Sequence, residues 1–376
     1  MQIRYVKNLF TSFVKRPIGV FLRKRKKERY KLSLAKQQLK VPDKGVSLSY
    51  AGLSVPDANG ILHGGRVKLK HLAQAYPEEK LLTNLLYLVS SAIPLHAEVL
   101  VRYLKGKGVK FVWTQNGVAY PAWDSDNYKA TNSRLSSLLH MADYVVYQSE
   151  FCRLSANRYL GEARVPNQVL YNPVDTEQFT PSDNPPSLDV WHLLVTGTHL
   201  QPDRVLLILK TLVELKIRGQ QAELVIAGRL GWPDGEKETH EAIKQLELTG
   251  SVELSGSYTQ DQAVGIYRAA HILFHIKYKD PCPTVPIEAM SCGVPVIGSF
   301  SGGMPELVSD EGGVLLEVPD VWDKMCYPEP EEMVEAVMNI MSDLENWRQK
   351  ARQRAVSHFS KGHWLEQHHQ IFAEVL

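Results

Sequence analysis

Short apolar runs alternate with amphipathic segments through the first half of the chain. The runs predict strands over residues 46–53, 84–90, 110–114 and 144–148, and the segments between them predict helices over residues 65–75, 96–105, 132–141 and 150–160. Strands that alternate with helices in this way form parallel βαβ units. The pattern therefore predicts an α/β domain over residues 41–185.

The same alternation restarts after a polar break. Residues 181–187 consist of Pro, Ser, Asp and Asn, which is the composition of a linker between domains. Beyond the linker, apolar runs predict strands over residues 191–196, 223–227, 252–255, 272–275 and 294–299. We therefore expect a second doubly wound, Rossmann-like domain over residues 186–352. Ligands of such sheets bind at the carboxyl ends of the strands, which predicts a site in the cleft between the two domains.

The first 40 residues have a different pattern. Ile3, Val6, Phe10, Phe13 and Val14 recur at helical spacing, basic side chains take the opposite face, and five consecutive basic residues follow at 23–27. This amphipathic, basic arm is typical of a segment that lies on an anionic membrane surface. A packed or solvated segment and a nucleic-acid-binding tail are the alternatives.

Charge separates the arm from the rest of the chain. The 376 residues carry 43 Lys and Arg against 41 Asp and Glu, but residues 1–40 hold thirteen basic residues and one acid, which leaves a net charge of −10 on the remainder. An acidic body repels a phosphate backbone, so we expect no nucleic-acid partner.

The rest of the composition narrows the class of protein. The chain contains no apolar run of the 18 residues that a membrane span needs, and its first 30 residues do not resemble a secretory signal. Its four cysteines form no Cys-x-x-Cys pair, which fits a reducing cytoplasm. Together with the arm, this predicts a peripheral protein on the cytoplasmic face of a membrane.

The densest group of candidate functional residues lies between positions 280 and 308. Thr284 is a suitable N-cap for a short helix over residues 285–292, with Asp280 in the loop before it and Glu288 inside it. Both carboxylates can accept hydrogen bonds from sugar hydroxyls. Gly302 and Gly303 precede another helix, and backbone N–H groups at such a position suit an anion such as a diphosphate.

Residues 288–297 (Glu-Ala-Met-Ser-Cys-Gly-Val-Pro-Val-Ile) and 302–308 (Gly-Gly-Met-Pro-Glu-Leu-Val) resemble the donor-site signature of family 4 (group 1) glycosyltransferases. Residues 169–179, a glycine-rich loop at Gly64 and Gly65, and a C-terminal helix over 353–376 that crosses back onto the first domain also resemble this family. The resemblance implies the two-domain GT-B fold, retention of anomeric configuration and independence of metal and cofactor. It implies that Glu288 binds the ribose of a UDP- or GDP-linked sugar, that Asp280 binds the transferred sugar, and that amides near Thr284, Gly302 and Gly303 contact sugar and diphosphate.

One departure from the family pattern concerns charge. The family has an Arg and a Lys after the first strand of the second domain, where they stabilise the departing diphosphate, but this chain has Thr198 near the Arg position, shortly after Gly197. We expect Arg204 and Arg229 to substitute for them. Prolines at 281 and 283 replace the commoner glycines of the donor loop and remove amide donors.

On the acceptor side, Asn116 follows a predicted strand, where family members often have a His. Asn116 could orient an acceptor hydroxyl but could not act as a general base. These features predict a hexosyltransferase. Its acceptor would be a hydroxyl of a lipid-linked or other membrane-associated glycan, and its role would be in the synthesis of a cell-surface polysaccharide such as lipopolysaccharide.

Several alternatives belong to other classes. A non-catalytic sugar-nucleotide-binding or scaffold protein of the same fold would fit the missing cations, and an epimerase or phosphorylase would share the fold. Asp124-Ser125-Asp126 matches a metal-binding Asp-x-Asp motif, but it lies in a polar loop. His363, His368 and His369 point to different faces of a helix, which favours a solvated terminal helix over a metal site.

Overall fold

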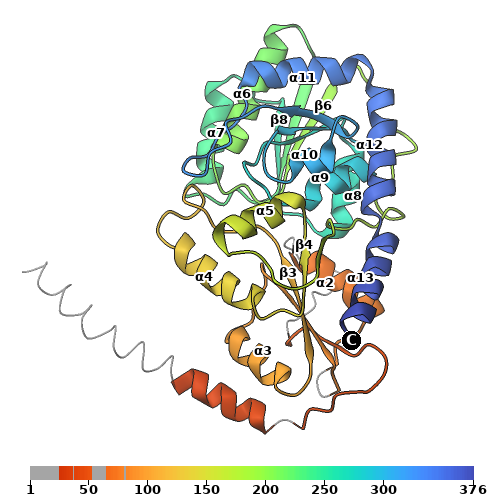
Figure 1. The fold of residues 1–376 in the computed structure, drawn as a ribbon. Coiled ribbons are helices and arrows are strands. Elements are labelled where there is room, and N and C mark those ends of the chain that lie inside the picture. The colour runs from red at the N-terminus through yellow and green to blue at the C-terminus, as the bar shows by residue number, and fades with distance from the viewer. Residues whose placement is uncertain (1–24, 37, 53–64, 80–81) are drawn as a thin grey trace, which may run out of the picture.

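The first domain is built on a parallel sheet with strand order β1-β2-β3-β4-β5 (Figure 1). The computed structural model describes residues 25–36, 38–52, 65–79 and 82–376. Within them, this domain contains β1 (Leu48–Ser49), α2 (Gly65–Ala75), β2 (Leu85–Val89), α3 (Ala97–Lys105), β3 (Lys110–Gln115), α4 (Tyr128–Leu139), β4 (Tyr144–Tyr147), α5 (Glu150–Tyr159) and β5 (Asn167–Val169). Each predicted strand and helix has a counterpart, although β1 is shorter than expected and α4 begins four residues earlier than expected.

The second domain has a parallel sheet with strand order β11-β10-β9-β6-β7-β8, and it lies above the first domain in Figure 1. Its elements are β6 (Trp191–Thr196), α6 (Asp203–Ile217), β7 (Ala222–Ala227), α7 (Gly235–Gln245), β8 (Val252–Gly256), α8 (Gln260–Arg268), β9 (Ile272–His275), α9 (Thr284–Ser291), β10 (Val296–Ser299), α10 (Met304–Val308), β11 (Gly313–Leu316), α11 (Pro330–Ser342) and α12 (Leu344–Phe359). Two Rossmann-like domains are therefore present, as the alternation predicted.

Continuous apolar runs mark the central strands because helices cover both faces of each sheet. All five residues of β2 and all four of β9 are buried. This is the usual burial of a parallel sheet, and it leaves only the strand ends open to a ligand.

The chain crosses between the domains at two adjacent places. The first crossing runs from the segment after β5 to β6, and the second leads from α12 into α13 (Lys361–Val375). Val174 in the first crossing pairs with Ser360 in the second, through bonds from Val174 N to Phe359 O (2.8 Å) and from Lys361 N to Val174 O (2.9 Å). The expected crossing helix over 353–376 is thus two helices that meet at Ser360.

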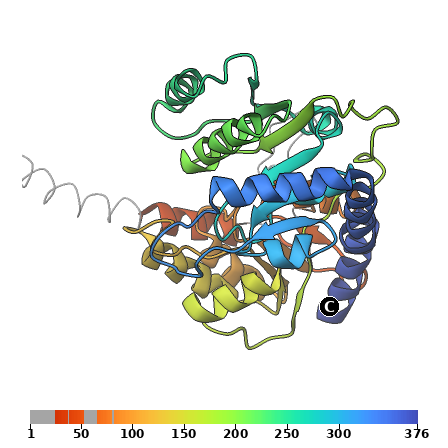
Figure 2. The ribbon, with the colours of Figure 1, turned by 90° about the horizontal axis from the view of Figure 1, so that it is seen from above.

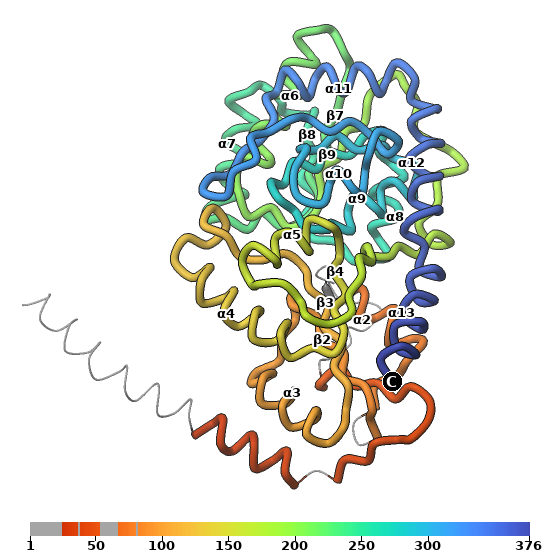
Figure 3. The backbone as a smooth tube through the Cα atoms, in the orientation of Figure 1, coloured from red at the N-terminus to blue at the C-terminus, as the bar shows by residue number. Residues whose placement is uncertain are grey.

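These two helices belong to different domains, as the blue tube at one edge of Figure 3 and the blue helices at the right of Figure 2 show. α12 packs against α9 in the second domain, whereas α13 packs against α2 in the first. Trp364, His368, Ile371 and Phe372 recur on one face of α13 and are buried in the first domain. The expectation of a solvated terminal helix is wrong, since His368 Nε2 lies 2.9 Å from the buried Tyr87 hydroxyl.

Part of the predicted arm packs on the first domain. Residues 25–35 form a helix, Leu34 is buried in the core of that domain, and the Tyr30 ring lies 5.6 Å from the ring of His96. The amphipathic pattern of residues 3–15 lies outside the described residues. Along the ranges that are described, none of the helices is long and apolar enough to cross a bilayer.

Candidate functional site

A cavity of about 650 Å³ lies between the two domains at the carboxyl ends of their strands. It is lined by seven of the predicted site residues, namely Asn116, Gly197, Arg204, Arg229, Asp280, Thr284 and Glu288. Gly64 is outside the described residues, and Gly65 is the first residue of α2. The structure therefore brings together residues of α6 and α9 and of the loops that follow β3, β6, β7 and β9.

Glu288 lies in α9 and is only 7% exposed. Its Oε1 accepts a hydrogen bond from Gln260 Nε2, and its Oε2 accepts one from the Tyr267 hydroxyl, each at 2.9 Å. Burial raises the pKa of Glu288 to about 7, because these two neutral donors do not replace the solvation of the charged carboxylate. The carboxylate can accept hydroxyl donors, and it changes its charge near neutral pH.

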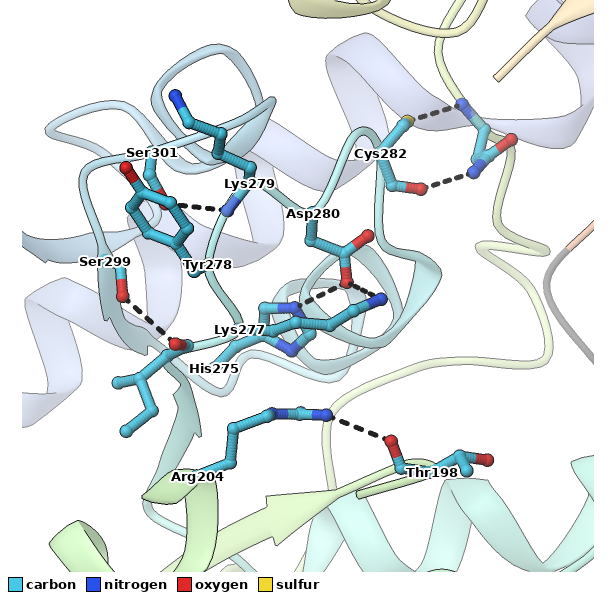
Figure 4. A network of polar contacts seen from close by, with 12 residues as sticks. Thr198, Arg204, His275, Lys277, Tyr278, Lys279, Asp280, Cys282, Ser299 and Ser301 are labelled. Carbon is cyan, nitrogen blue, oxygen red and sulfur yellow. Dashed lines mark hydrogen bonds and ion pairs between the residues drawn. The ribbon is translucent and has the colours of Figure 1, made fainter. Parts of the chain in front are cut away.

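Asp280 is held by His275, the last residue of β9, and by Lys277 of the loop that follows (Figure 4). Its Oδ2 lies 2.9 Å from Lys277 Nζ and 3.2 Å from His275 Nε2. Burial alone would raise the pKa of Asp280, but the Lys277 ammonium and the His275 hydrogen bond outweigh it and hold that pKa well below its usual range. Asp280 is therefore a permanent carboxylate, and burial keeps His275 neutral by lowering its pKa.

Arg204 is nearly buried beneath the same cavity. Its Nη1 donates to the Thr198 carbonyl oxygen (3.0 Å), while its Nε has no hydrogen-bond partner among the described residues. Nδ1 of the neighbouring His275 also lacks a partner there. These unsatisfied groups beside a polar cavity indicate that the site is prepared for a polar ligand. Arg229, by contrast, is exposed at the cavity wall.

Two lysines that the sequence analysis missed contribute positive charge. Lys277 lines the cavity and lies three residues before Asp280, so its place at the end of β9 was a usable signal. Lys68 lies on α2, and its Nζ donates a long bond of 3.4 Å to Asn116 Oδ1. No local pattern marks Lys68, because its neighbours in the structure are far from it in the chain.

The glycines at 302 and 303 have a packing role. A Cβ on Gly302, whose φ is +65°, would lie 2.4 Å from the Asp280 carbonyl oxygen, and one on Gly303 would lie 2.2 Å from that of Pro281. The Gly303 N–H already donates to the Asp280 carbonyl oxygen (2.9 Å). Neither glycine lines the cavity. Both permit the close approach that fixes the Asp280 loop.

The N-terminus of α9 also differs from the expectation. The helix begins at Thr284, so Pro283 is the N-cap residue and the Thr284 side chain does not cap the helix. Gly293 follows the end of α9 with φ of +73°, a left-handed conformation that glycine adopts without strain. The expected cap is thus displaced by one residue, whereas the expected end of the helix is present.

A second cavity of about 600 Å³ adjoins the first one. The two share Asn116, Lys277, Asp280 and Pro281 in their walls. The second cavity is lined by the rings of Tyr120, Trp123, Phe151, Tyr278 and Trp322. A polar cavity and an aromatic cavity therefore meet at Asp280.

Asn116 is oriented at this junction by bonds on both sides. Its Nδ2 donates to Ser91 Oγ and its backbone N–H donates to Ser90 Oγ, each at 2.8 Å, while its Oδ1 faces Lys68. The side chain is therefore fixed as part of the common wall.

The two domains are joined around the cavities by specific contacts. Glu306 of α10 accepts the N–H groups of Glu150 (2.6 Å) and Phe151 (2.7 Å) at the start of α5. Trp322, in the loop between β11 and α11, stacks on Phe151 at 5.8 Å, and its carbonyl oxygen accepts the Ala122 N–H (3.0 Å). These contacts hold the walls of the second cavity together.

The residues weighed as metal ligands are used in other ways. Asp124 Oδ1 accepts bonds from the N–H and Nδ2 of Asn127, and Asp124 and Asp126 line neither cavity. His369 Nδ1 lies 2.9 Å from the Tyr76 hydroxyl. Over the described part of the chain, no three His, Cys, Asp or Glu side chains are grouped as a metal site requires.

Comparison with known sequences finds a family match in the second domain. Residues 190–355 match the family model of glycosyl transferases group 1. The phosphatidylinositol N-acetylglucosaminyltransferase gpi3 subunit of Schizosaccharomyces pombe is 24% identical over 217 residues, which cover 57% of this chain and 44% of that protein. The D-inositol 3-phosphate glycosyltransferase of Corynebacterium jeikeium is 26% identical over 45% of this chain and 40% of its own length. The matches thus span less than half the length of these relatives.

Solved structures share the whole architecture. HepE of Anabaena in complex with UDP superposes with a TM-score of 0.65 over 89% of this chain and 100% of its own, at 17% identity. Sucrose-phosphate synthase of Thermosynechococcus elongatus gives a TM-score of 0.63 over 92% of this chain and 90% of its own, also at 17% identity. The family match and the shared fold together support a group 1 glycosyltransferase of the GT-B type.

Proposed function

We propose that the protein transfers a sugar from a nucleotide-diphosphate donor to a hydroxyl group of a membrane-associated glycan or glycolipid, with retention of configuration and without a metal ion. The observation that carries the proposal is the junction of the two cavities at Asp280. A donor in the polar cavity and an acceptor in the aromatic cavity would meet there. The UDP bound to the similar HepE fold supports a nucleotide in the first cavity.

The side chains of the first cavity suit such a donor. Glu288 would accept the ribose hydroxyls, and the permanent carboxylate of Asp280 would accept hydroxyls of the transferred sugar. Arg204, Arg229 and Lys277 would offset the charge of the diphosphate as the bond to the sugar breaks. They would take the place of the Arg and Lys that the resemblance led us to expect, because preorganised charges in a partly buried site stabilise a developing anion.

The transfer itself would need no basic side chain. The acceptor oxygen would bond to the anomeric carbon on the face that the diphosphate leaves, and the departing phosphate oxygen would take the acceptor's proton. Asn116, fixed by Ser91 and Lys68, would orient the acceptor hydroxyl. The second cavity is therefore the proposed acceptor subsite.

The basic arm supports a membrane-associated acceptor. Residues 1–40 carry a net charge of +12, and each cation near an anionic surface contributes about 1 kcal/mol. The arm would hold the protein on the cytoplasmic face of a membrane, where lipid-linked intermediates of a cell-surface polysaccharide occur.

The decisive experiment is a binding and turnover screen of the full chain. Isothermal titration with UDP and GDP identifies the base, and release of free nucleotide from a panel of UDP- and GDP-sugars identifies the sugar, with Glu288→Gln as the matched variant. We expect one nucleotide to bind and one of its sugars to be consumed. The absence of binding by both nucleotides would refute the proposal.

A scaffold protein that binds sugar nucleotides without turnover is the second candidate, because Thr198 stands where the family has a cation. It predicts tight nucleotide binding and no consumption of any donor, with or without acceptor extracts.

A further inference from the structure

We infer that the second cavity binds a hydroxylated ring that carries an oxyanion, and that Arg134 recognises the oxyanion. This inference rests on the proposed function, which makes this cavity the acceptor subsite, and it adds the chemical class of the acceptor. It is carried by the charges of the cavity, by its aromatic rings and by the position of one of its walls next to the arm helix.

Some of the basic side chains that line the cavity form ion pairs with carboxylates, and one does not. Lys277 is paired with Asp280, and Lys279 is paired with Asp320. Arg134 on α4 also lines the cavity, but no carboxylate in the described part of the chain lies within ion-pair distance of it. Its positive charge therefore remains available, in a protein body whose net charge outside the arm is −10.

The Arg134 guanidinium is held at one point only. Its Nη2 donates to the Pro94 carbonyl oxygen at 2.9 Å, and the side chain is otherwise exposed. The remaining N–H groups form a planar set of donors that matches two oxygens of a phosphate or carboxylate. Because the Pro94 bond fixes the direction of the side chain, less side-chain entropy is lost when an oxyanion binds.

The rings supply the complementary surface for the rest of the ligand. Trp123 is 45% exposed, and Lys277 Nζ lies 5.7 Å from its ring centroid. Tyr120 and Trp322, whose ring centroids lie 5.3 Å apart edge to face, also line the cavity. An exposed aromatic face beside convergent polar groups fits a sugar or cyclitol ring, which is apolar on its C–H face and hydroxylated at its edge.

One wall of this cavity leads toward the arm helix. Ile93 lines the cavity, Pro94 binds Arg134, and His96 at the end of the same loop packs against Tyr30 of the arm helix. In Figure 1 the arm helix (red) runs beside α3, which begins directly after His96. The oxyanion can thus come from a lipid headgroup or from a soluble sugar phosphate, and the chemistry at Arg134 is the same for both.

The test uses the full chain saturated with the nucleotide that it binds. Phosphorylated rings (glucose 1-phosphate, glucose 6-phosphate and myo-inositol 1-phosphate) are titrated beside neutral glucose and myo-inositol and beside inorganic phosphate. We expect at least one phosphorylated ring to bind about tenfold more tightly than its neutral counterpart, the effect of one charge-assisted hydrogen-bonding pair. Inorganic phosphate alone should bind more weakly than that ring.

Three variants assign the contributions. Arg134→Ala should remove the preference for the phosphorylated ring while nucleotide affinity is unchanged, and Trp123→Ala should weaken both members of the pair. Arg164→Ala, an exposed arginine of the same domain outside the cavity, is the matched control and should change nothing. A preference that survives Arg134→Ala, or equal affinities within every pair, would overturn the inference even where nucleotide binding and sugar transfer support the proposed function.

Vesicles separate the two sources of the oxyanion. Phosphatidylcholine vesicles with and without phosphatidylinositol are offered to protein that lacks residues 1–24, which removes six of the thirteen basic residues of the arm, and each variant is compared with Arg134 intact in the same truncated chain. Weaker binding of Arg134→Ala to the phosphatidylinositol vesicles assigns the lipid headgroup. Unchanged vesicle binding, with the loss of affinity confined to the soluble ring phosphate, assigns the soluble acceptor.

Discussion

Lys68 offers the sharpest test of how the site is built. Its side chain is 2% exposed on α2, and its only hydrogen bond in the described structure is the 3.4 Å contact with Asn116 Oδ1. Burial lowers the pKa of Lys68 to about 8, so the ammonium is still charged at pH 7. The protein therefore keeps a poorly solvated cation behind the wall that the two cavities share.

The destabilisation caused by Lys68 follows from the difference between its pKa in the unfolded and in the folded protein. A fall of the pKa from 10.5 to about 8 costs about 3.5 kcal/mol of folding free energy, at about 1.4 kcal/mol for each factor of ten. Methionine has a similar length and no charge. Lys68→Met should therefore increase the free energy of unfolding at pH 7 by up to about 3.5 kcal/mol.

The gain has a definite dependence on pH. The folded-state pKa of Lys68 lies below its unfolded value, so the unfolded wild-type chain binds more protons between pH 8 and 10.5. The wild type thus becomes relatively more stable as the pH rises through this window, and the advantage of Lys68→Met shrinks. Titrating groups that do not interact with Lys68 contribute equally to both proteins and cancel in the difference.

The assay is urea unfolding of both proteins at pH 7 and at pH 9.5, followed by circular dichroism. Lys68→Arg keeps the charge, and Lys70→Met removes a less buried lysine from the same helix; neither should give the pH-dependent gain. Lys68→Met should also lower kcat/KM about tenfold, because Asn116 loses a partner and the donor loses a nearby cation. A variant that is less stable at pH 7, or a gain that is equal at both pH values, would refute the reasoning.

Three other predictions concern the donor and the membrane. Glu288→Gln should raise the dissociation constant of the bound nucleotide about 10- to 100-fold, since a bond to a charged acceptor is worth about 1.5–3 kcal/mol. The nucleotide affinity of the wild type should increase as the pH rises through about 7, where Glu288 ionises. A wild-type affinity that does not change with pH in titration calorimetry would contradict this. Arg204→Lys should lower kcat about tenfold with little change in donor KM, and unchanged turnover in a donor-consumption assay would mean that another cation serves the diphosphate. Deleting residues 1–24 should release the protein from anionic vesicles in a sedimentation assay while Leu34 still packs on the first domain, and full retention would argue against the membrane role of the arm.

Local patterns were sufficient for the fold and for one side of the site. The apolar runs predicted the buried strands because a parallel sheet covered on both faces needs apolar residues at every position. Asp280, Thr284 and Glu288 lie within nine residues of chain, so their spacing alone placed them on one loop and helix. Their common cavity agrees with that expectation.

The rest of the site depends on contacts between distant segments. Lys68 meets Asn116 and Cys282 only after both sheets have formed, and Trp322 comes from a polar loop with no pattern that indicates its contact with Phe151. Glu306 belongs to a recognised motif, but its bonds to the start of α5 require the second domain to lie on the first. The close packing of Gly302 and Gly303 against the carbonyl oxygens of Asp280 and Pro281 could not be foreseen, because a glycine needed for close packing and one needed for anion binding look the same in sequence.

The paired crossings at Val174 and Ser360 limit how the protein can open. The two connections between the domains are hydrogen-bonded to each other at one edge of the molecule. They therefore act as one hinge, and the domains can move relative to each other mainly by rotating about that edge. Glu306 and Trp322 lie on other elements of the interface, where a rotation would separate them from α5 and from Phe151. The two cavities share part of their walls, so they would widen and narrow together, and in the proposed function one movement would govern the entry of both substrates.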